Sequence, residues 1–136
     1  MINKIVICLF FILLTTVFQS YASESSDFIK YTDSTLDALD EVEVVITSKN
    51  GTERDADKAL QKVDIALKKF DRIQMKEDSP ENDLFLKITY CRLRYAIVLN
   101  EGIYGEQHDK ARSEYKEIMD LFGKYKTKNK KKQKNQ

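Results

Sequence analysis

The sequence predicts an all-α protein of four helices, arranged as an antiparallel bundle or as two stacked helical hairpins, after a cleaved signal peptide. Its 136 residues include four glycines and one proline, which is typical of helices joined by short loops. Apolar residues recur at helical spacing in four segments, which are separated by turn-forming or polar stretches. The one β-branched run, residues 42–47, has no second strand candidate to pair with. These three observations together favour helices throughout.

The first 22 residues have the layout of a secretory signal peptide. Lys4 gives a positive start, residues 5–18 are apolar except for two threonines, and the small residues Ser20 and Ala22 stand where a signal peptidase reads the chain. We therefore expect cleavage between Ala22 and Ser23, and a periplasmic or secreted protein. A membrane anchor is the alternative, but about 14 apolar residues are fewer than the roughly 20 that span a bilayer.

Removal of residues 1–22 leaves 114 residues, which is enough for one domain with one core. We expect this all-α domain to span residues 23–125, followed by a disordered tail over residues 126–136, where no hydrophobic residue occurs. Residues 23–57 hold ten acidic and three basic residues, whereas residues 124–136 hold seven lysines and no acid. The lysines of this basic tail are Lys124, Lys126, Lys128, Lys130, Lys131, Lys132 and Lys134.

The first helix is expected from Ser26 to Thr47, with one apolar and one acidic face. The apolar arc consists of Phe28, Tyr31, Ala38, Leu39, Val42, Val45 and Ile46. The acidic face consists of Asp33, Asp37, Asp40 and Glu41. This face is either a solvated surface or a docking site for an electropositive partner or for the chain's own tail. Asn50-Gly51 then predicts a turn.

The second helix is expected from Glu53 to Met75, because Thr52 and Asp55 resemble a capping box. Its apolar stripe consists of Ala59, Val63, Ala66, Leu67, Phe70 and Ile73. The stripe predicts that this helix, like the first, buries one side and leaves the other in water.

The third helix is expected from Pro80 to Asn100. Ser79 is a capping residue, and proline is tolerated at the first helical position. Gly102 is expected to end the helix in a left-handed conformation. Because this helix is apolar nearly all round, we expect it to be the most buried of the four.

The fourth helix is expected from Asp109 to Tyr125. Its apolar face consists of Ala111, Tyr115, Ile118, Met119, Phe122 and Tyr125. Since the loops between the four helices are short, consecutive helices should run antiparallel.

Catalytic chemistry has little support in the sequence. His108 is the only histidine, and it stands beside Asp109 at a predicted helix start, where we expect a solvated side chain. Cys91 lies within an apolar helix, so we expect a buried small hydrophobe rather than a nucleophile. No glycine-rich phosphate loop or metal-binding motif is present. We therefore expect no catalytic residue, no metal ion and no cofactor.

The alternative function is that of a small enzyme or metal-binding protein built on the loop before the fourth helix. Its oxygen and imidazole groups would be Glu101, Glu106, His108 and Asp109. Their spacing matches no known set of metal ligands.

Arg92 falls within the apolar arc of the third helix, and three interpretations stay open. Its stem lies along the core while the guanidinium reaches water; it pairs with a carboxylate of the acidic first helix; or it marks a groove for a partner. With the acidic face of the first helix, Arg92 is the candidate contact for a partner protein.

Taken together, these observations predict an exported, non-catalytic helical protein that binds another exported protein, as an adaptor, an inhibitor or an immunity-type protein. A further alternative is weak binding of anionic lipid or nucleic acid through the basic tail. No aromatic residue is interleaved with the lysines beyond Tyr125, so specific nucleic-acid recognition is not expected.

Overall fold

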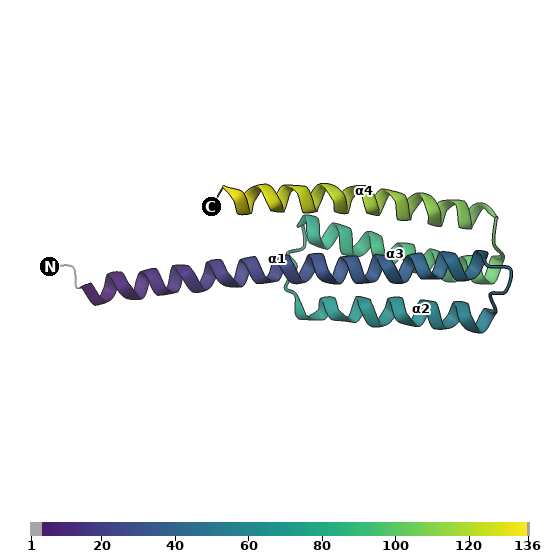
Figure 1. Ribbon diagram of the computed structural model, residues 1–136, viewed down its shortest axis with the longest axis horizontal. Helices are drawn as coiled ribbons and strands as arrows, with labels where there is room; N and C mark the ends of the chain where they lie inside the picture. Colours follow the sequence, from purple (N-terminus) through teal and green to yellow (C-terminus); the bar gives the residue numbers. More distant parts are fainter. Residues whose placement is uncertain (1–3, 136) are drawn as a thin grey trace.

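The computed structural model describes the backbone of residues 4–135 and the side chains of residues 24–135. Its elements are α1 (Lys4–Thr47), α2 (Glu53–Leu67), the 3₁₀-helix η1 (Lys68–Arg72), α3 (Pro80–Glu101) and α4 (Glu106–Lys134). Every element of this described part is helical, which confirms the all-α prediction. α1 and α2 form one antiparallel hairpin, α3 and α4 form a second, and the two hairpins pack together (Figure 1).

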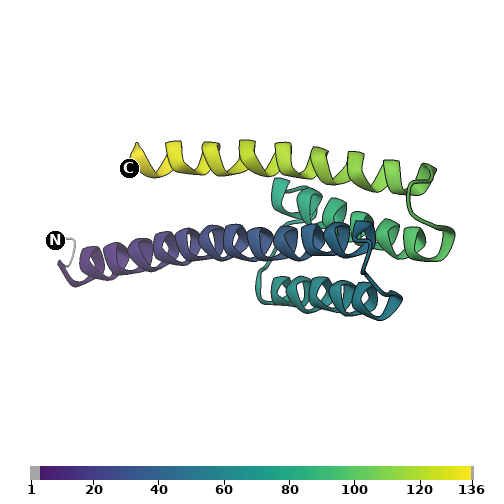
Figure 2. The ribbon, with the colours of Figure 1, turned by 45° about the vertical axis from the view of Figure 1, so that its right-hand side comes forward.

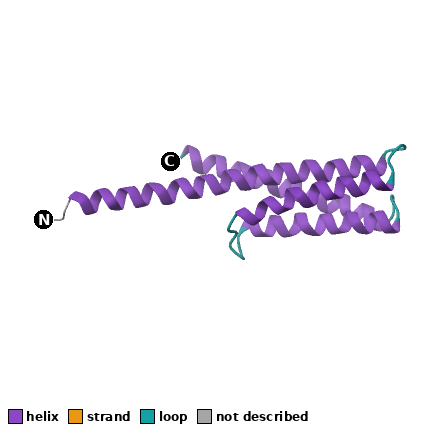
Figure 3. Cartoon of the chain, turned by 90° about the horizontal axis from the view of Figure 1, so that it is seen from below, coloured by secondary structure: helices purple, strands orange, loops and turns teal. Residues whose placement is uncertain are grey.

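The long helices α1 and α4 extend past the ends of α2 and α3, towards the same end of the molecule (Figure 2). Loops connect the helices only at the two ends of the four-helix region (Figure 3). The basic tail therefore lies at the end of the molecule where the described part of α1 begins.

The hydrophobic core takes residues from all four helices and from η1. Phe28, Phe70 and Phe122 are each 1% exposed, and the ring of Phe28 lies 5.6 Å from Phe70 and 5.3 Å from Tyr125 in edge-to-face arrangements. Phe28 is the first residue of the described core. The predicted cleavage site after Ala22 thus precedes all of it.

The predicted helix starts at Thr52 and Ser79 are confirmed. The hydroxyl of Thr52 accepts a hydrogen bond from the backbone N–H of Asp55 at 3.2 Å, and the Asp55 carboxylate accepts one from the backbone N–H of Thr52 at 3.2 Å. The hydroxyl of Ser79 accepts from the backbone N–H of Asn82 at 3.2 Å. These caps satisfy N–H groups that have no partner within the helix.

The predicted end of the second helix at Met75 is wrong. The α-helix ends at Leu67, residues 68–72 form a 3₁₀-helix, and Ile73 has extended backbone angles. The tighter 3₁₀ turn accompanies the burial of Phe70, which contacts Phe28 and Tyr31 on α1. Packing of this ring against α1 therefore outweighs the helical pattern of the sequence.

The connection between α3 and α4 also differs from the prediction. Gly102 ends α3 with φ 109° and ψ 150°, which is outside the left-handed helical region, although this conformation still favours glycine. The fourth helix begins at Glu106 rather than at Asp109, after Gly105. Its first turn carries Glu106 and Asp109, whose negative charge complements the positive end of the helix dipole.

The prediction of a disordered tail is wrong over residues 126–134, because α4 continues to Lys134. Lysine is a good helix former, and positive charge is favourable at the end of a helix. Two contacts hold the base of this segment: Lys126 pairs with Asp33 at 3.2 Å, and the hydroxyl of Tyr125 donates to Glu81 at 2.6 Å.

The predicted signal peptide lies outside the residues whose side chains are described, so its cleavage stays a prediction. Among residues 24–135, whose side chains the structure describes, no helix combines the length and apolar character that crossing a membrane requires.

Candidate functional site

Helix α3 carries two apolar stripes on opposite sides. The buried stripe consists of Leu84, Ile88, Cys91, Tyr95 and Val98, which are 0–3% exposed. The exposed stripe consists of Leu86, Tyr90, Leu93 and Ile97, which are 43%, 63%, 48% and 40% exposed. The prediction that the third helix is the most buried of the four is therefore wrong, because the other three helices cover only one side of it.

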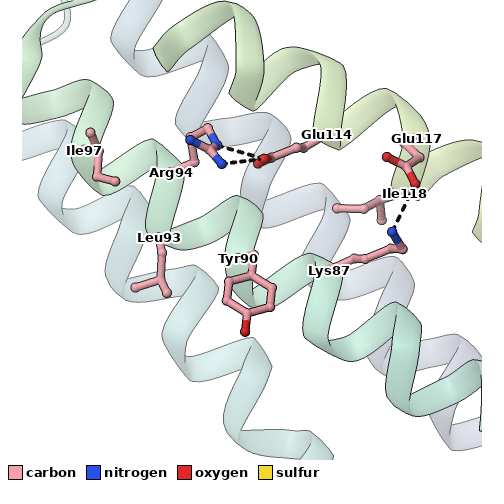
Figure 4. Close-up of a pocket in the computed structure, with 8 residues that line it drawn as sticks. All are labelled: Lys87, Tyr90, Leu93, Arg94, Ile97, Glu114, Glu117 and Ile118. Carbon is pink, nitrogen blue, oxygen red and sulfur yellow. Dashed lines mark hydrogen bonds and ion pairs between the residues drawn. The ribbon is translucent and has the colours of Figure 1, made fainter. Parts of the chain in front are cut away.

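A groove of about 450 Å³ lies beside the exposed stripe, between α3 and α4. It is lined by Lys87, Tyr90, Leu93, Arg94, Ile97, Glu114, Glu117 and Ile118 (Figure 4). Tyr90 and Leu93 project from α3, whereas Lys87 and Arg94 reach towards α4. The groove thus joins half-exposed apolar side chains of α3 to a fully buried residue of α4, Ile118.

The α4 side of the groove carries two ion pairs. Lys87 Nζ lies 3.0 Å from Glu117 Oε1, and Arg94 Nη2 lies 2.7 Å from Glu114 Oε1. The hydrogen bond from Lys87 to Glu117 raises the pKa of Lys87, so this lysine stays charged. The positive and negative charges on this edge balance each other within the chain.

Directly beside the exposed stripe, towards α2, α3 carries neutral residues, and the nearest charges on that side, Arg92 and Asp64, pair with each other. The neutral residues at this edge are Asn82, Thr89, Ala96 and Asn100. Three of them bond to backbone carbonyls of the chain: Asn82 to Glu77, Thr89 to Phe85, and Asn100 to Ala96. The exposed stripe is thus bordered by neutral polar groups on one side and by internally paired charges on the other.

Arg92 does not lie free beside this groove. Its Nε and Nη2 donate to the two carboxylate oxygens of Asp64 at 2.8 and 2.7 Å. Of the three sequence interpretations, the ion pair comes nearest to the structure, but the carboxylate belongs to α2 rather than to the acidic first helix. A two-pronged arginine–carboxylate contact fixes the angle between α2 and α3.

The acidic face of α1 is not brought to the groove, and half of it is used within the chain. Asp33 pairs with Lys126 of α4, and Glu41 pairs with Lys62 of α2. Asp37 and Asp40 are exposed. The docking of the chain's own tail on this face, one of the predicted possibilities, is therefore present at a single lysine.

His108 is fully buried rather than solvated, which corrects the prediction for this residue. Its Nδ1 accepts a hydrogen bond from the backbone N–H of Tyr104 at 2.9 Å. The ring proton is therefore assigned to Nε2, which donates to Glu43 Oε2 at 2.8 Å. Both ring nitrogens are engaged, so neither is free to act as a base or as a metal ligand.

Glu43 is the centre of a polar cluster that the sequence analysis missed. Its carboxylate also accepts hydrogen bonds from Arg112 Nε at 2.7 Å and from the Tyr95 hydroxyl at 3.0 Å. We call Glu43, Tyr95, His108 and Arg112 the Glu43 cluster; it ties α1 to α3 and α4. Burial raises the pKa of Glu43, but the hydrogen bonds from its three partners outweigh burial and hold the pKa below its ordinary value of 4.5.

The other groups of the proposed enzyme or metal site are not brought together. Glu106 pairs with Lys110, while Glu101 and Asp109 are exposed. Among the side chains that the structure describes, no group of three or more histidine, cysteine, aspartate or glutamate residues has an arrangement that holds a metal ion.

Cys91 is buried, as predicted, and its thiol lies 3.7 Å from the carbonyl oxygen of Ala111. Burial raises the pKa of this thiol to about 12, so it stays protonated at neutral pH. A protonated thiol is a poor nucleophile and a poor metal ligand.

The lysines of the basic tail lie along the last turns of α4. Lys126 is half-buried and lies 4.3 Å above the ring of Phe122, in addition to its contact with Asp33. The other six lysines are exposed. Lys126 therefore holds the helix to the bundle, whereas the rest present positive charge to solvent.

Comparison of the chain with known proteins finds no matching protein-family model, no matching curated protein and no matching solved structure. Within the structure, the polar clusters differ from the exposed apolar stripe in whether their contacts are satisfied. The Glu43 cluster and the pair of Arg92 with Asp64 are satisfied by contacts within the bundle. The exposed stripe and its groove are instead open to solvent.

Proposed function

We propose that this chain is an exported, non-catalytic helical protein that binds another protein through the exposed stripe of α3. The observation that carries the proposal is the row of four large apolar side chains, each 40–63% exposed, beside a groove. Contiguous apolar surface of this kind is characteristic of interaction sites, whereas singly exposed apolar residues are common on any protein. Aromatic and aliphatic side chains in such a row are suitable anchors for a partner.

The state of the reactive side chains supports a role in binding rather than catalysis. Both nitrogens of His108 are engaged, and burial keeps Cys91 protonated. The groove beside the exposed stripe is lined by aliphatic, aromatic and ion-paired side chains. Such a lining suits contact with an apolar surface better than proton transfer or metal chemistry.

Export is supported by the residues on both sides of the predicted cleavage site. After cleavage, the chain would begin with Ser23 and carry Glu24 and Asp27 in the first turn of its first helix. Serine is a good helix cap, and acidic residues are favourable in a first helical turn. Mass measurement of the protein from its native compartment should give a chain that begins at Ser23 or within about two residues of it. An intact Met1 in the membrane fraction would instead mean that residues 1–22 are an anchor.

The binding proposal is tested by affinity capture with the mature protein in its native compartment. We expect one or a few proteins that the wild type captures and that Tyr90→Lys and Leu93→Lys fail to capture. Ile65→Lys is the matched control, because Ile65 is also an exposed apolar residue, 62% exposed, but on α2. Capture that is the same for the wild type and both stripe variants would contradict the proposal.

A further inference from the structure

We infer that the partner element that occupies the groove is an amphipathic α-helix, held by apolar contacts and without a net charge requirement. This inference rests on the proposed function, and it adds what kind of surface the partner presents. The spacing of the exposed stripe, the charges on its edges and its limited area each support it.

The spacing of the exposed stripe matches a helix. Leu86, Tyr90, Leu93 and Ile97 follow one another at intervals of four, three and four residues. This is the interval of a helical seam, in which side chains of one helix fit between those of another that lies nearly parallel to it. The buried stripe of α3 has the same intervals and contacts helices of its own chain.

The edges of the groove favour an occupant recognised by shape rather than by charge. On the α4 side, Lys87 and Arg94 are already paired with Glu117 and Glu114. On the α2 side, the edge residues are neutral, and the nearest charges, Arg92 and Asp64, pair with each other. A helix with an apolar seam and balanced charges beside it complements this surface.

The area of the exposed stripe argues for one helix rather than for a second copy of this chain. A stable interface between two whole proteins, such as two copies of this chain, buries about 800 Å² or more on each partner. Even a fully buried aromatic side chain supplies only about 150–250 Å², so four half-exposed side chains supply about half of what is needed. A single helix that places two or three side chains into the groove fits the available surface.

The probe is a fluorescent synthetic peptide of about 18 residues, because shorter helices are marginal in water. It carries leucines at intervals of four, three and four residues, with equal numbers of glutamates and lysines on its other face. A control peptide of the same composition has its leucines at every second position. We expect binding of the helical peptide, measured by fluorescence anisotropy, to be at least about tenfold tighter than that of the control.

The same titration with protein variants locates the site. Tyr90→Lys and Leu93→Lys should each weaken binding about tenfold, whereas Ile65→Lys and a chain without residues 127–136 should bind like the wild type. A change from about 50 to 500 mM salt should alter the affinity less than about threefold, because few free charges are involved. Circular dichroism of the variants verifies that they are folded.

Three outcomes would overturn the inference: equal binding of the two peptides, loss of binding at high salt or without the lysine tail, and a wild-type dimer that Leu93→Lys dissociates in sedimentation. The last outcome would make a second copy the occupant. If the native partner still depends on Leu93 but the helical peptide does not bind, the proposed function stands and only the helical partner is refuted. If the partner captured from the native compartment is indifferent to Leu93, the proposed function itself fails.

Discussion

The two apolar stripes of α3 have the same spacing but lie in opposite surroundings. Ile88, in the buried stripe, is fully buried, whereas Ile97, in the exposed stripe, is 40% exposed. Tyr95 and Tyr90 form a second such pair, 1% and 63% exposed. A helical wheel does not distinguish the stripes, because both consist of large apolar residues at helical intervals.

The comparison shows what an apolar pattern reports. It indicates that a helix face favours contact with another apolar surface, and it does not indicate whether that surface belongs to the same chain. Here α1, α2 and α4 cover one side of α3, and no element of the described residues covers Tyr90 or Leu93. The proposed binding function therefore rests on this stripe, which has the pattern of a core seam and stays exposed.

The largest expected effect comes from truncating one isoleucine to alanine on each stripe. Ile88→Ala should lower the free energy of unfolding by about 2–5 kcal/mol, because it removes buried methyl groups and leaves a cavity. Ile97→Ala should lower it by less than about 1 kcal/mol, since much of that side chain is already in water. Urea denaturation of both variants measures the difference. Similar losses would mean that the exposed stripe is covered in solution.

The second prediction concerns the Glu43 cluster, which joins the buried side of α3 to α1 and α4. Glu43→Gln should lower the free energy of unfolding by about 2–3 kcal/mol at neutral pH, because three donors lose a charged acceptor. Glu41→Gln is the matched control, as its pair with Lys62 is exposed and such pairs contribute at most about 1 kcal/mol. Equal effects of the two variants in urea denaturation would refute a structural role for the cluster.

The pH dependence of stability, compared between the wild type and Glu43→Gln, tests the role of the Glu43 carboxylate independently. Because the pKa of Glu43 is lowered on folding, its contribution is fully present above the ordinary value of 4.5 and is lost as the pH falls through the pKa of the folded protein. The stability difference between the wild type and Glu43→Gln should therefore shrink below about pH 4.5. A difference that stays constant into acid would mean that folding does not lower the pKa of Glu43.

The third prediction compares two tyrosines on the opposite sides of α3. Tyr95→Phe should lower the free energy of unfolding by about 1 kcal/mol, because the hydroxyl donates to Glu43 in a buried site. Tyr90→Phe should leave stability unchanged within about 0.5 kcal/mol, since its side chain is largely solvated. Thermal unfolding measures both, and a larger loss for Tyr90→Phe would reverse the assignment of the two faces.

The smallest effect is expected from deletion of residues 127–136. The contacts of Tyr125 and Lys126 with the bundle remain in this variant, so the melting temperature should stay nearly the same. Binding to anionic vesicles should weaken at low salt, because each lysine near such a surface contributes about 1 kcal/mol at best. At physiological salt, screening over about 8 Å reduces this contribution. Unfolding of the truncated protein would show that the end of α4 supports the bundle.

Local signals in the sequence determined the four helices and about half of their boundaries. Thr52 with Asp55, and Ser79 with Pro80, start helices because their side chains satisfy N–H groups within a few residues of themselves. The apolar faces of the helices and the burial of Cys91 also follow from residue type and spacing. Such features depend on neighbours along the chain, and those neighbours are visible in the sequence.

The tertiary structure alone decided the features that depend on distant residues. Glu43 and His108 are 65 residues apart, and only the packing of α4 against α1 brings them to 2.8 Å. The 3₁₀-helix that contains Phe70 packs against Phe28 on another helix, and Arg92 pairs with a carboxylate on α2 rather than on α1. The exposure of the stripe on α3 is also decided by the tertiary structure. Its pattern is readable in the sequence, but its exposure depends on how many helices the bundle has to cover α3.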